Sequence, residues 1–175
     1  MGFGLLVLGY MTVLSAVYIY VWYAVLIPVI GAFVIFAAFC KLQEYNIYFK
    51  ISKYISILYV LVLIGLIPFY IMEQDIDYIS KIIRILVLFV FHYFMLSGIH
   101  KLASGVDNQK ISKNAKLNIY FTYIYFGTGI FGISGFGGIY FALLEFAMGL
   151  VYFFCNLLCI YRCFLQITYE GHDEN

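Results

Sequence analysis

Four apolar blocks constrain this chain more than any other feature of its sequence. They cover residues 3–40, 54–72, 82–99 and 117–161, and short polar segments separate them. An apolar run of about 18 residues or more is typical of a helix that crosses a membrane. Charged residues make up only 11% of the chain, against about 25% in a soluble domain. The sequence therefore predicts an all-α polytopic membrane helix bundle, a single transmembrane domain covering residues 1–175.

The first and last blocks are too long for one membrane span each. A helix needs about 20 residues to cross the hydrocarbon, so each of these blocks is divided in two. Interfacial aromatic residues near 18–23 and glycines at 132–138 mark the expected turns. The predicted spans are residues 3–20, 24–40, 54–72, 82–99, 117–133 and 139–161. A single broken span in the first block would leave five helices and is the alternative.

Three polar loops and one proline accompany this threading. The loops are expected at 41–53, 73–81 and 100–116. Pro28 is expected in the first turns of the second helix, where its missing N–H costs least. One end of a six-helix bundle then holds eight of the ten basic residues, which are Lys41, Lys50, Lys53, Lys101, Lys110, Lys113, Lys116 and Arg162. Because Lys and Arg collect on the cytoplasmic side of membrane proteins, both termini are predicted to be cytoplasmic.

The last predicted span carries a seam of polar and small residues. Alternating steps of four and three residues put this seam on one helical stripe. Its members are Glu145, Gly149, Tyr152, Asn156, Cys159, Cys163, Gln166 and Glu170. A polar group in hydrocarbon is costly unless it is paired or faces a cavity, so the seam is expected on the inside of the bundle. It either packs against neighbouring helices or lines a site for a substrate or ion.

Five residues are the candidates for a ligand-binding site or ion pathway: Glu145, His92, Asn156, Tyr152 and Arg84. A carboxylate inside a span costs about 2.5–3.5 kcal/mol to insert and is a functional candidate by default, which puts Glu145 first. A structural ion pair between Glu145 and Arg84 is the alternative. His92 is expected near the middle of the fourth helix, level with Tyr152. There it either relays protons, meets a ligand, or donates a hydrogen bond to a neighbour.

Motifs for metal, cofactor or nucleic-acid binding are not found. Neither HExxH nor CxxC occurs, and the four cysteines have spacings unsuited to a disulfide framework, so they are expected to be reduced. The segment GTGIFG at 127–132 matches the dinucleotide fingerprint by letter but lies inside a span without a preceding strand. Its glycines predict close helix packing and a tight turn, or a broken helix that binds a solute. We expect no catalytic residue, metal, cofactor or nucleic-acid partner.

The start MGFGLLVLGY and the tail IYRCFLQITYEGHDEN resemble an uncharacterised family of small multi-pass bacterial membrane proteins. That family has no known activity, so the resemblance implies only a multi-pass protein of the bacterial plasma (inner) membrane. Six short helices in 175 residues are also similar in size to the substrate-binding subunits of vitamin-uptake transporters.

The polar seam, His92 and the glycines favour a small-solute carrier or membrane-embedded binding subunit, and not an enzyme. The alternative is a noncatalytic membrane partner, meaning a scaffold, regulator or immunity-type protein that acts through other membrane proteins. An intramembrane enzyme would need a nucleophile or metal constellation, and only scattered single groups are present. The expected partners are the lipid bilayer and either a small-molecule ligand or a membrane protein.

Overall fold

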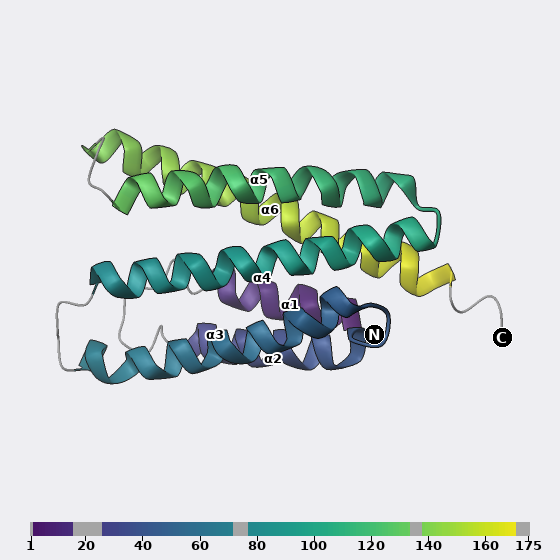
Figure 1. The fold of residues 1–175 in the computed structure, drawn as a ribbon, viewed down its shortest axis with the longest axis horizontal. Coiled ribbons are helices and arrows are strands. Elements are labelled where there is room, and N and C mark those ends of the chain that lie inside the picture. The colour runs from purple at the N-terminus through teal and green to yellow at the C-terminus, as the bar shows by residue number, and fades with distance from the viewer. Residues whose placement is uncertain (1, 16–25, 72–76, 134–137, 171–175) are drawn as a thin grey trace.

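The computed structural model describes residues 2–15, 26–71, 77–133 and 138–170, and these residues form six α-helices (Figure 1). The helices are α1 (Gly2–Ser15), α2 (Leu26–Leu42), α3 (Ile47–Ile71), α4 (Asp77–Gly105), α5 (Gln109–Ile133) and α6 (Gly138–Glu170). No strand occurs among the described residues. The all-α prediction is confirmed.

Among the described residues, three helices contain stretches long and apolar enough to cross a membrane. These stretches are Ile47–Gly65 in α3, Ile85–Gly105 in α4 and Gly138–Ile167 in α6. Two shorter apolar helices, Gly2–Val13 and Ile27–Leu42, lie at the start of the chain. This pattern is compatible with a membrane protein.

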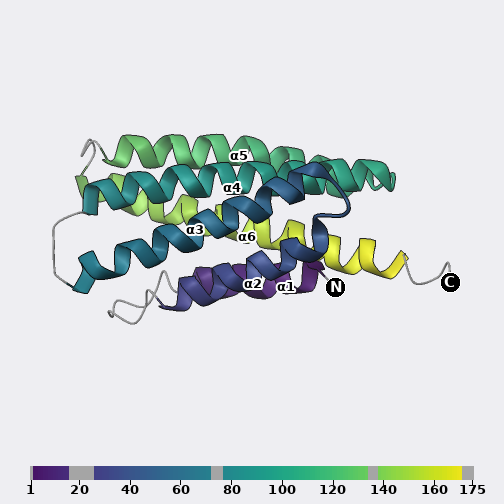
Figure 2. The same cartoon turned by 60° about the horizontal axis from the view of Figure 1, so that its bottom comes forward.

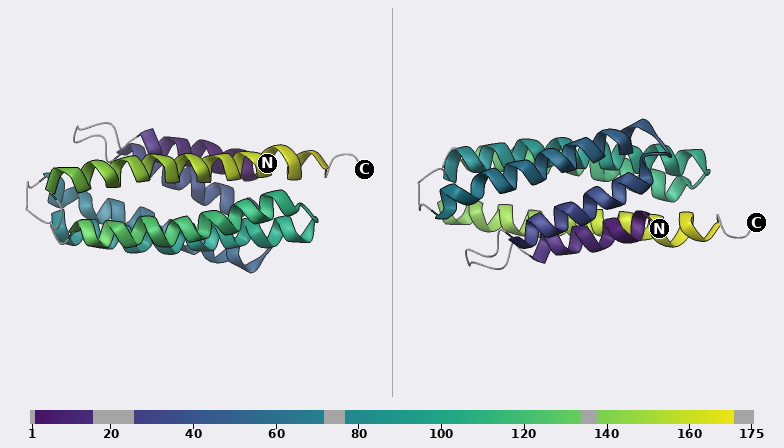
Figure 3. Two further views of the ribbon diagram at one scale, coloured as in Figure 1. Left: turned by 90° about the horizontal axis from the view of Figure 1, so that it is seen from above. Right: turned by 90° about the horizontal axis from the view of Figure 1, so that it is seen from below.

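The helices run along one long axis and form a closed bundle (Figures 2 and 3). Each helix packs against the next one in the chain, and α6 also packs against α1 and α4. The beginning of α1 and the end of α6 lie at the same end of the bundle (Figure 1). The short connections at 43–46 and 106–108 lie at that end as well.

The helices extend into segments that the sequence predicts as loops, and this part of the prediction is wrong. Residues 47–53, 100–105 and 109–116 are helical, so two of the three loops are much shorter than expected. Asn46 caps α3 by accepting a hydrogen bond from the N–H of Phe49 at 3.1 Å, and Asn108 caps α5 through Ile111 at 3.2 Å. The charged residues in these segments favoured loops, but a helix with a capped end tolerates charged side chains wherever they reach water.

Other boundary predictions have mixed outcomes. Pro28 is the third residue of α2, as expected. The predicted turn at 18–23 falls outside the described residues, and so do most of the turn at 132–138 and part of the loop at 73–81. The choice between five and six spans therefore stays a prediction.

Glycines bring α1 and α2 into backbone contact. A Cβ atom added at Gly9 would lie 2.9 Å from the backbone oxygen of Gly31, and one at Gly31 would lie 3.0 Å from that of Gly9. Small residues at such crossings let helices approach closely and gain van der Waals contact, which drives helix association in membranes. The main core lies beside this contact and includes the fully buried Phe39, Met95 and Ile160.

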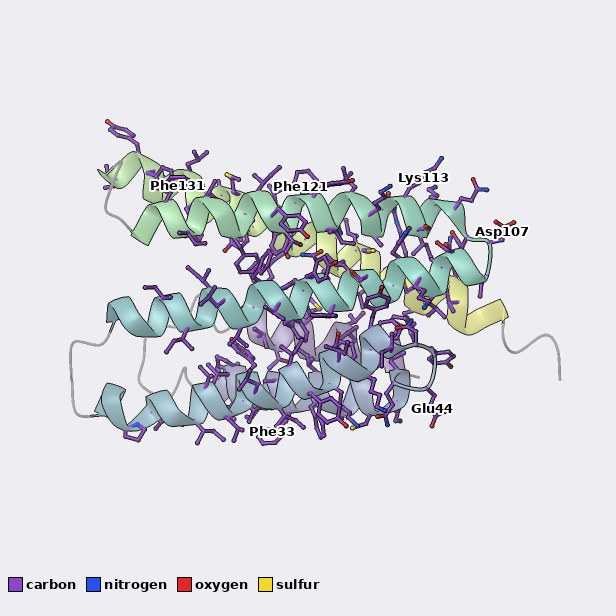
Figure 4. The ribbon with its side chains drawn as sticks, viewed as in Figure 1. Phe33, Glu44, Asp107, Lys113, Phe121 and Phe131 are labelled. Atoms are coloured by element: carbon purple, nitrogen blue, oxygen red, sulfur yellow. The ribbon has the colours of Figure 1, made fainter. Side chains whose placement is uncertain are left out.

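The outer faces of the bundle are apolar over much of their length. Phe33 of α2 is 52% exposed, Phe121 of α5 is 40% exposed and Val151 of α6 is 60% exposed. Charged residues such as Glu44, Asp107 and Lys113 lie toward the end where α6 ends (Figure 4). A bundle that is apolar both in its core and on its outer faces is suited to the hydrocarbon interior of a membrane.

Candidate functional site

The polar seam of α6 faces the inside of the bundle, as predicted. Gly149, Tyr152, Asn156, Cys159 and Cys163 are all buried. The neighbouring side chains Val151, Phe154 and Leu158 are 53–60% exposed. Glu145 is half-buried at one end of the seam and Gln166 is exposed near the other.

The seam meets polar side chains from three other helices at the centre of the bundle. We call this group the central polar cluster, and its members are Tyr10 of α1, His92 of α4, Thr122 of α5, and Tyr152 and Asn156 of α6. Each member is at most 3% exposed. The cluster unites three of the five predicted site residues with two that the sequence did not single out.

His92 is held by two hydrogen bonds of 2.7 Å, one to the Tyr10 hydroxyl through Nε2 and one to the Leu88 carbonyl through Nδ1. Because a carbonyl oxygen can only accept, Nδ1 must carry a proton. In the neutral ring Nε2 is then an acceptor, and the Tyr10 hydroxyl donates to it. The prediction that His92 lies level with Tyr152 is confirmed, since their ring centroids are 5.4 Å apart.

A second chain of hydrogen bonds links α5 to α6. The Thr122 hydroxyl donates to the Asn118 carbonyl at 2.8 Å. Since that uses its only proton, the Tyr152 hydroxyl, 2.9 Å away, donates to Thr122. The Asn118 amide in turn donates to the Cys155 carbonyl at 3.1 Å.

Asn156 is the exception in this ordered group. Its side chain is 0% exposed, yet neither amide atom has a hydrogen-bond partner among the described residues. The hydroxyls of Tyr10 and Tyr152 lie beside it. Because their protons are directed to His92 and Thr122, they could only accept from the Asn156 N–H groups, and the Asn156 carbonyl oxygen has no donor. Buried polar groups are hydrogen-bonded in the great majority of structures. An unpartnered buried amide is therefore a group with free capacity to bind a small polar molecule.

Aromatic rings surround the cluster. The ring of His92 has the rings of Tyr10 and Phe126 at 5.7 Å and that of Phe153 at 6.1 Å between centroids. Such a wall lowers the local dielectric, which strengthens every hydrogen bond that is made inside it.

Glu145 lies apart from the cluster, on the glycine face of α5. A Cβ atom added at Gly132 would lie 2.7 Å from Glu145 Oε2, and one at Gly129 would lie 3.5 Å from Oε1. The Tyr125 phenol lies within electrostatic range of the Glu145 carboxyl group. Arg84 is a helical residue of α4, but its side chain is outside the described part, so the Arg84–Glu145 pair stays a prediction.

The glycine segment 127–132 is helical throughout. The residues that precede it belong to the same helix, α5, and not to the strand that a dinucleotide fingerprint follows. Because Gly129 and Gly132 have no side chains, the Glu145 side chain can pack closely against α5. All four cysteines are free, as expected from their spacing.

A groove runs between α5 and α6 on the outside of the cluster. Its apolar section has a volume of about 240 Å³, and both Tyr125 and Tyr152 line it. These two rings stack with centroids 4.8 Å apart and planes 19° apart. Tyr152 therefore belongs both to the wall of the groove and to the central polar cluster.

Two cluster members were not predicted from the sequence, for different reasons. Thr122 follows Asn118 by one helical turn within an apolar run, which is a signal for a polar stripe on α5. Tyr10 had no comparable signal, because a tyrosine in a membrane helix is common at the interface as well as inside. Comparison with known proteins finds no protein family, curated protein or solved structure that matches this chain.

Proposed function

We propose that this chain is a multi-pass protein of the plasma membrane in which all six helices cross the bilayer. The exposed apolar sides of the bundle support this placement. The shared end of α1 and α6 supports an even number of crossings, and the basic residues near it favour a cytoplasmic position for both termini. A reporter active only in the cytoplasm, fused after the last residue, should be active. Activity restricted to a reporter that works outside the cytoplasm would contradict the proposed orientation.

Within that framework we propose a small-solute carrier or membrane-embedded binding subunit. The observation that carries the proposal is the fully buried Asn156 amide without a partner. A polar group in that state lowers the stability of the fold, and a functional role accounts for its presence at the crossing of four helices.

The chemistry of the cluster indicates the class of solute. An asparagine side chain offers two N–H donors and one carbonyl acceptor in one plane. No carboxylate or lysine belongs to the cluster, so a charged solute would lack a counter-charge there. A small neutral molecule with an adjacent donor and acceptor, such as an amide or a lactam ring, fits the amide, and the aromatic walls suit a flat solute.

The stacked rings of Tyr125 and Tyr152 provide the proposed route to this site. Both rings line the groove and Tyr152 also belongs to the cluster. The proposed route opens when either ring rotates. Gly149 leaves room for Tyr125, since a Cβ atom added at Gly149 would lie 3.1 Å from the Tyr125 hydroxyl. His92, which holds its proton on Nδ1, is a group through which solute binding and proton movement can be coupled.

Native mass spectrometry of the gently extracted protein tests this function. The expected result is a stoichiometric small molecule that is lost in Asn156→Leu and kept in Gln43→Leu, a comparable change at a half-buried amide outside the cluster and the groove. Retention of the same molecule by Asn156→Leu would contradict the proposal.

A noncatalytic membrane partner is the second candidate. Its supporting observation is the exposed apolar surface of α5 and α6, where Phe131 is 69% and Leu143 60% exposed. A stoichiometric membrane protein in the same spectra, without a small molecule, would favour this function over the first.

A further inference from the structure

The groove between α5 and α6 has two sections of different chemistry. The apolar section of about 240 Å³ continues into a second hollow of about 160 Å³, and both share Phe121 and Cys155 as lining residues. The second hollow adds the polar residues Asn114, Asn118 and Arg162 to a wall that also includes Leu117 and Leu158. We call it the polar end of the groove.

The groove has the length of one bilayer leaflet. Along α6 it runs from Ala147 to Arg162, which at about 1.5 Å per residue is about 23 Å. Half of a hydrocarbon core about 30 Å thick is about 15 Å, and the headgroup region adds several ångströms. A molecule in this groove would therefore reach from the membrane surface to the midplane.

Charge is restricted to the polar end. Arg162 is exposed there, and the guanidinium group presents paired donors that match a phosphate. Lys110 and Lys113 lie within one turn of Asn114 on α5 and add positive charge beside it. No acidic residue is among the residues that line either section.

The apolar section suits a hydrocarbon chain. Its walls include Phe121, Ile124 and Val151, which are 40–60% exposed. The stacked rings of Tyr125 and Tyr152 form part of its wall. A cation at one end of a leaflet-long apolar groove is complementary to an anionic amphiphile, and not to a purely apolar helix from another protein.

We propose that the groove binds one anionic phospholipid of the cytoplasmic leaflet. Its phosphate lies at Arg162 and Asn114, and one acyl chain lies along Phe121 and Val151. The acyl chain then passes the stacked rings of Tyr125 and Tyr152. This inference depends on the membrane placement proposed above but not on the solute site.

The test compares phosphatidylglycerol with phosphatidylcholine of the same acyl chains, each added to the delipidated protein and followed by native mass spectrometry. The expected result is a single retained phosphatidylglycerol with an affinity at least about fivefold higher than that of phosphatidylcholine. Arg162→Gln should remove this preference. Lys116→Gln, which neutralises an exposed cation of α5 that does not line the groove, should keep it.

A second variant tests the acyl section. Val151→Trp fills the groove and should weaken retention of both lipids, while the exposed Leu61→Trp on α3 should not. Equal retention of the two lipids, or equal effects of Arg162→Gln and Lys116→Gln, would overturn the proposal. A dimer that carries no lipid would overturn it as well, because a second copy would then cover the groove. Asn156→Leu should keep the phospholipid, which separates this proposal from failure of the solute site.

Discussion

The hydroxyl oxygen of Tyr10 lies 2.7 Å from Nε2 of His92, although 82 positions separate the two residues. Tyr10 is on α1, which packs mainly against α2 and α6, and His92 is on α4. The bond therefore ties the first helix to the fourth across the centre of the bundle. Both side chains are at most 3% exposed, so water cannot substitute for either partner.

Loss of the Tyr10 hydroxyl should destabilise the protein. Tyr10→Phe leaves Nε2 of His92 buried without a partner, which costs about 1–3 kcal/mol. Thermal unfolding in detergent should show a lower midpoint than for Tyr120→Phe, which removes the hydroxyl of a tyrosine that is 56% exposed. Equal midpoints for the two variants would mean that the bond contributes nothing to stability.

Two buried asparagines of similar burial should respond in opposite directions to the same substitution. Asn156→Leu removes an unpartnered amide, so unfolding free energy should stay the same or rise by about 1–2 kcal/mol. Asn118→Leu removes the hydrogen bond that the Asn118 amide donates to the Cys155 carbonyl, so it should lower the free energy of unfolding. Thermal melts of both variants check this. A large loss of stability in Asn156→Leu would show that its amide has a partner in the protein after all.

The contact between α1 and α2 depends on the absence of side chains. In Gly9→Ala the new methyl group would lie 2.9 Å from the Gly31 oxygen and the Ile35 nitrogen, which are backbone atoms and cannot give way. The two helices must separate, and the melting temperature should fall. Gly127→Ala is the control, because nothing lies within 4 Å of its added Cβ and a helical alanine gains about 0.5–1 kcal/mol. A stable Gly9→Ala would contradict the close crossing.

Thiol labelling can test the orientation of α6. Cys155 is half-buried and lines the groove, whereas Cys163 is 0% exposed in the core. In variants that retain one cysteine each, a membrane-permeable maleimide should modify Cys155 much faster than Cys163. Similar rates would mean that α6 is rotated relative to this arrangement or that the core opens readily.

The internal face of α6 could be predicted because helical periodicity and the cost of polar groups in hydrocarbon are local rules. The stripe from Gly149 to Cys163 is buried as those rules require. The ends of the helices were less predictable. Lys50 and Lys113 lie in helices although charge suggested loops, since asparagine caps decide where α3 and α5 begin.

The sequence alone determined that this chain is helical and apolar, with His92 and Tyr152 at similar depth, because those properties follow from composition and spacing. Only the tertiary structure decided which side chains meet. Tyr10 reaches His92 and Thr122 reaches Tyr152 through the packing of four helices. Packing also left Asn156 without a partner and placed Glu145 on glycines of α5. Contacts between helices depend on shape complementarity across distant segments, and the periodicity of a single helix contains no information about its neighbours.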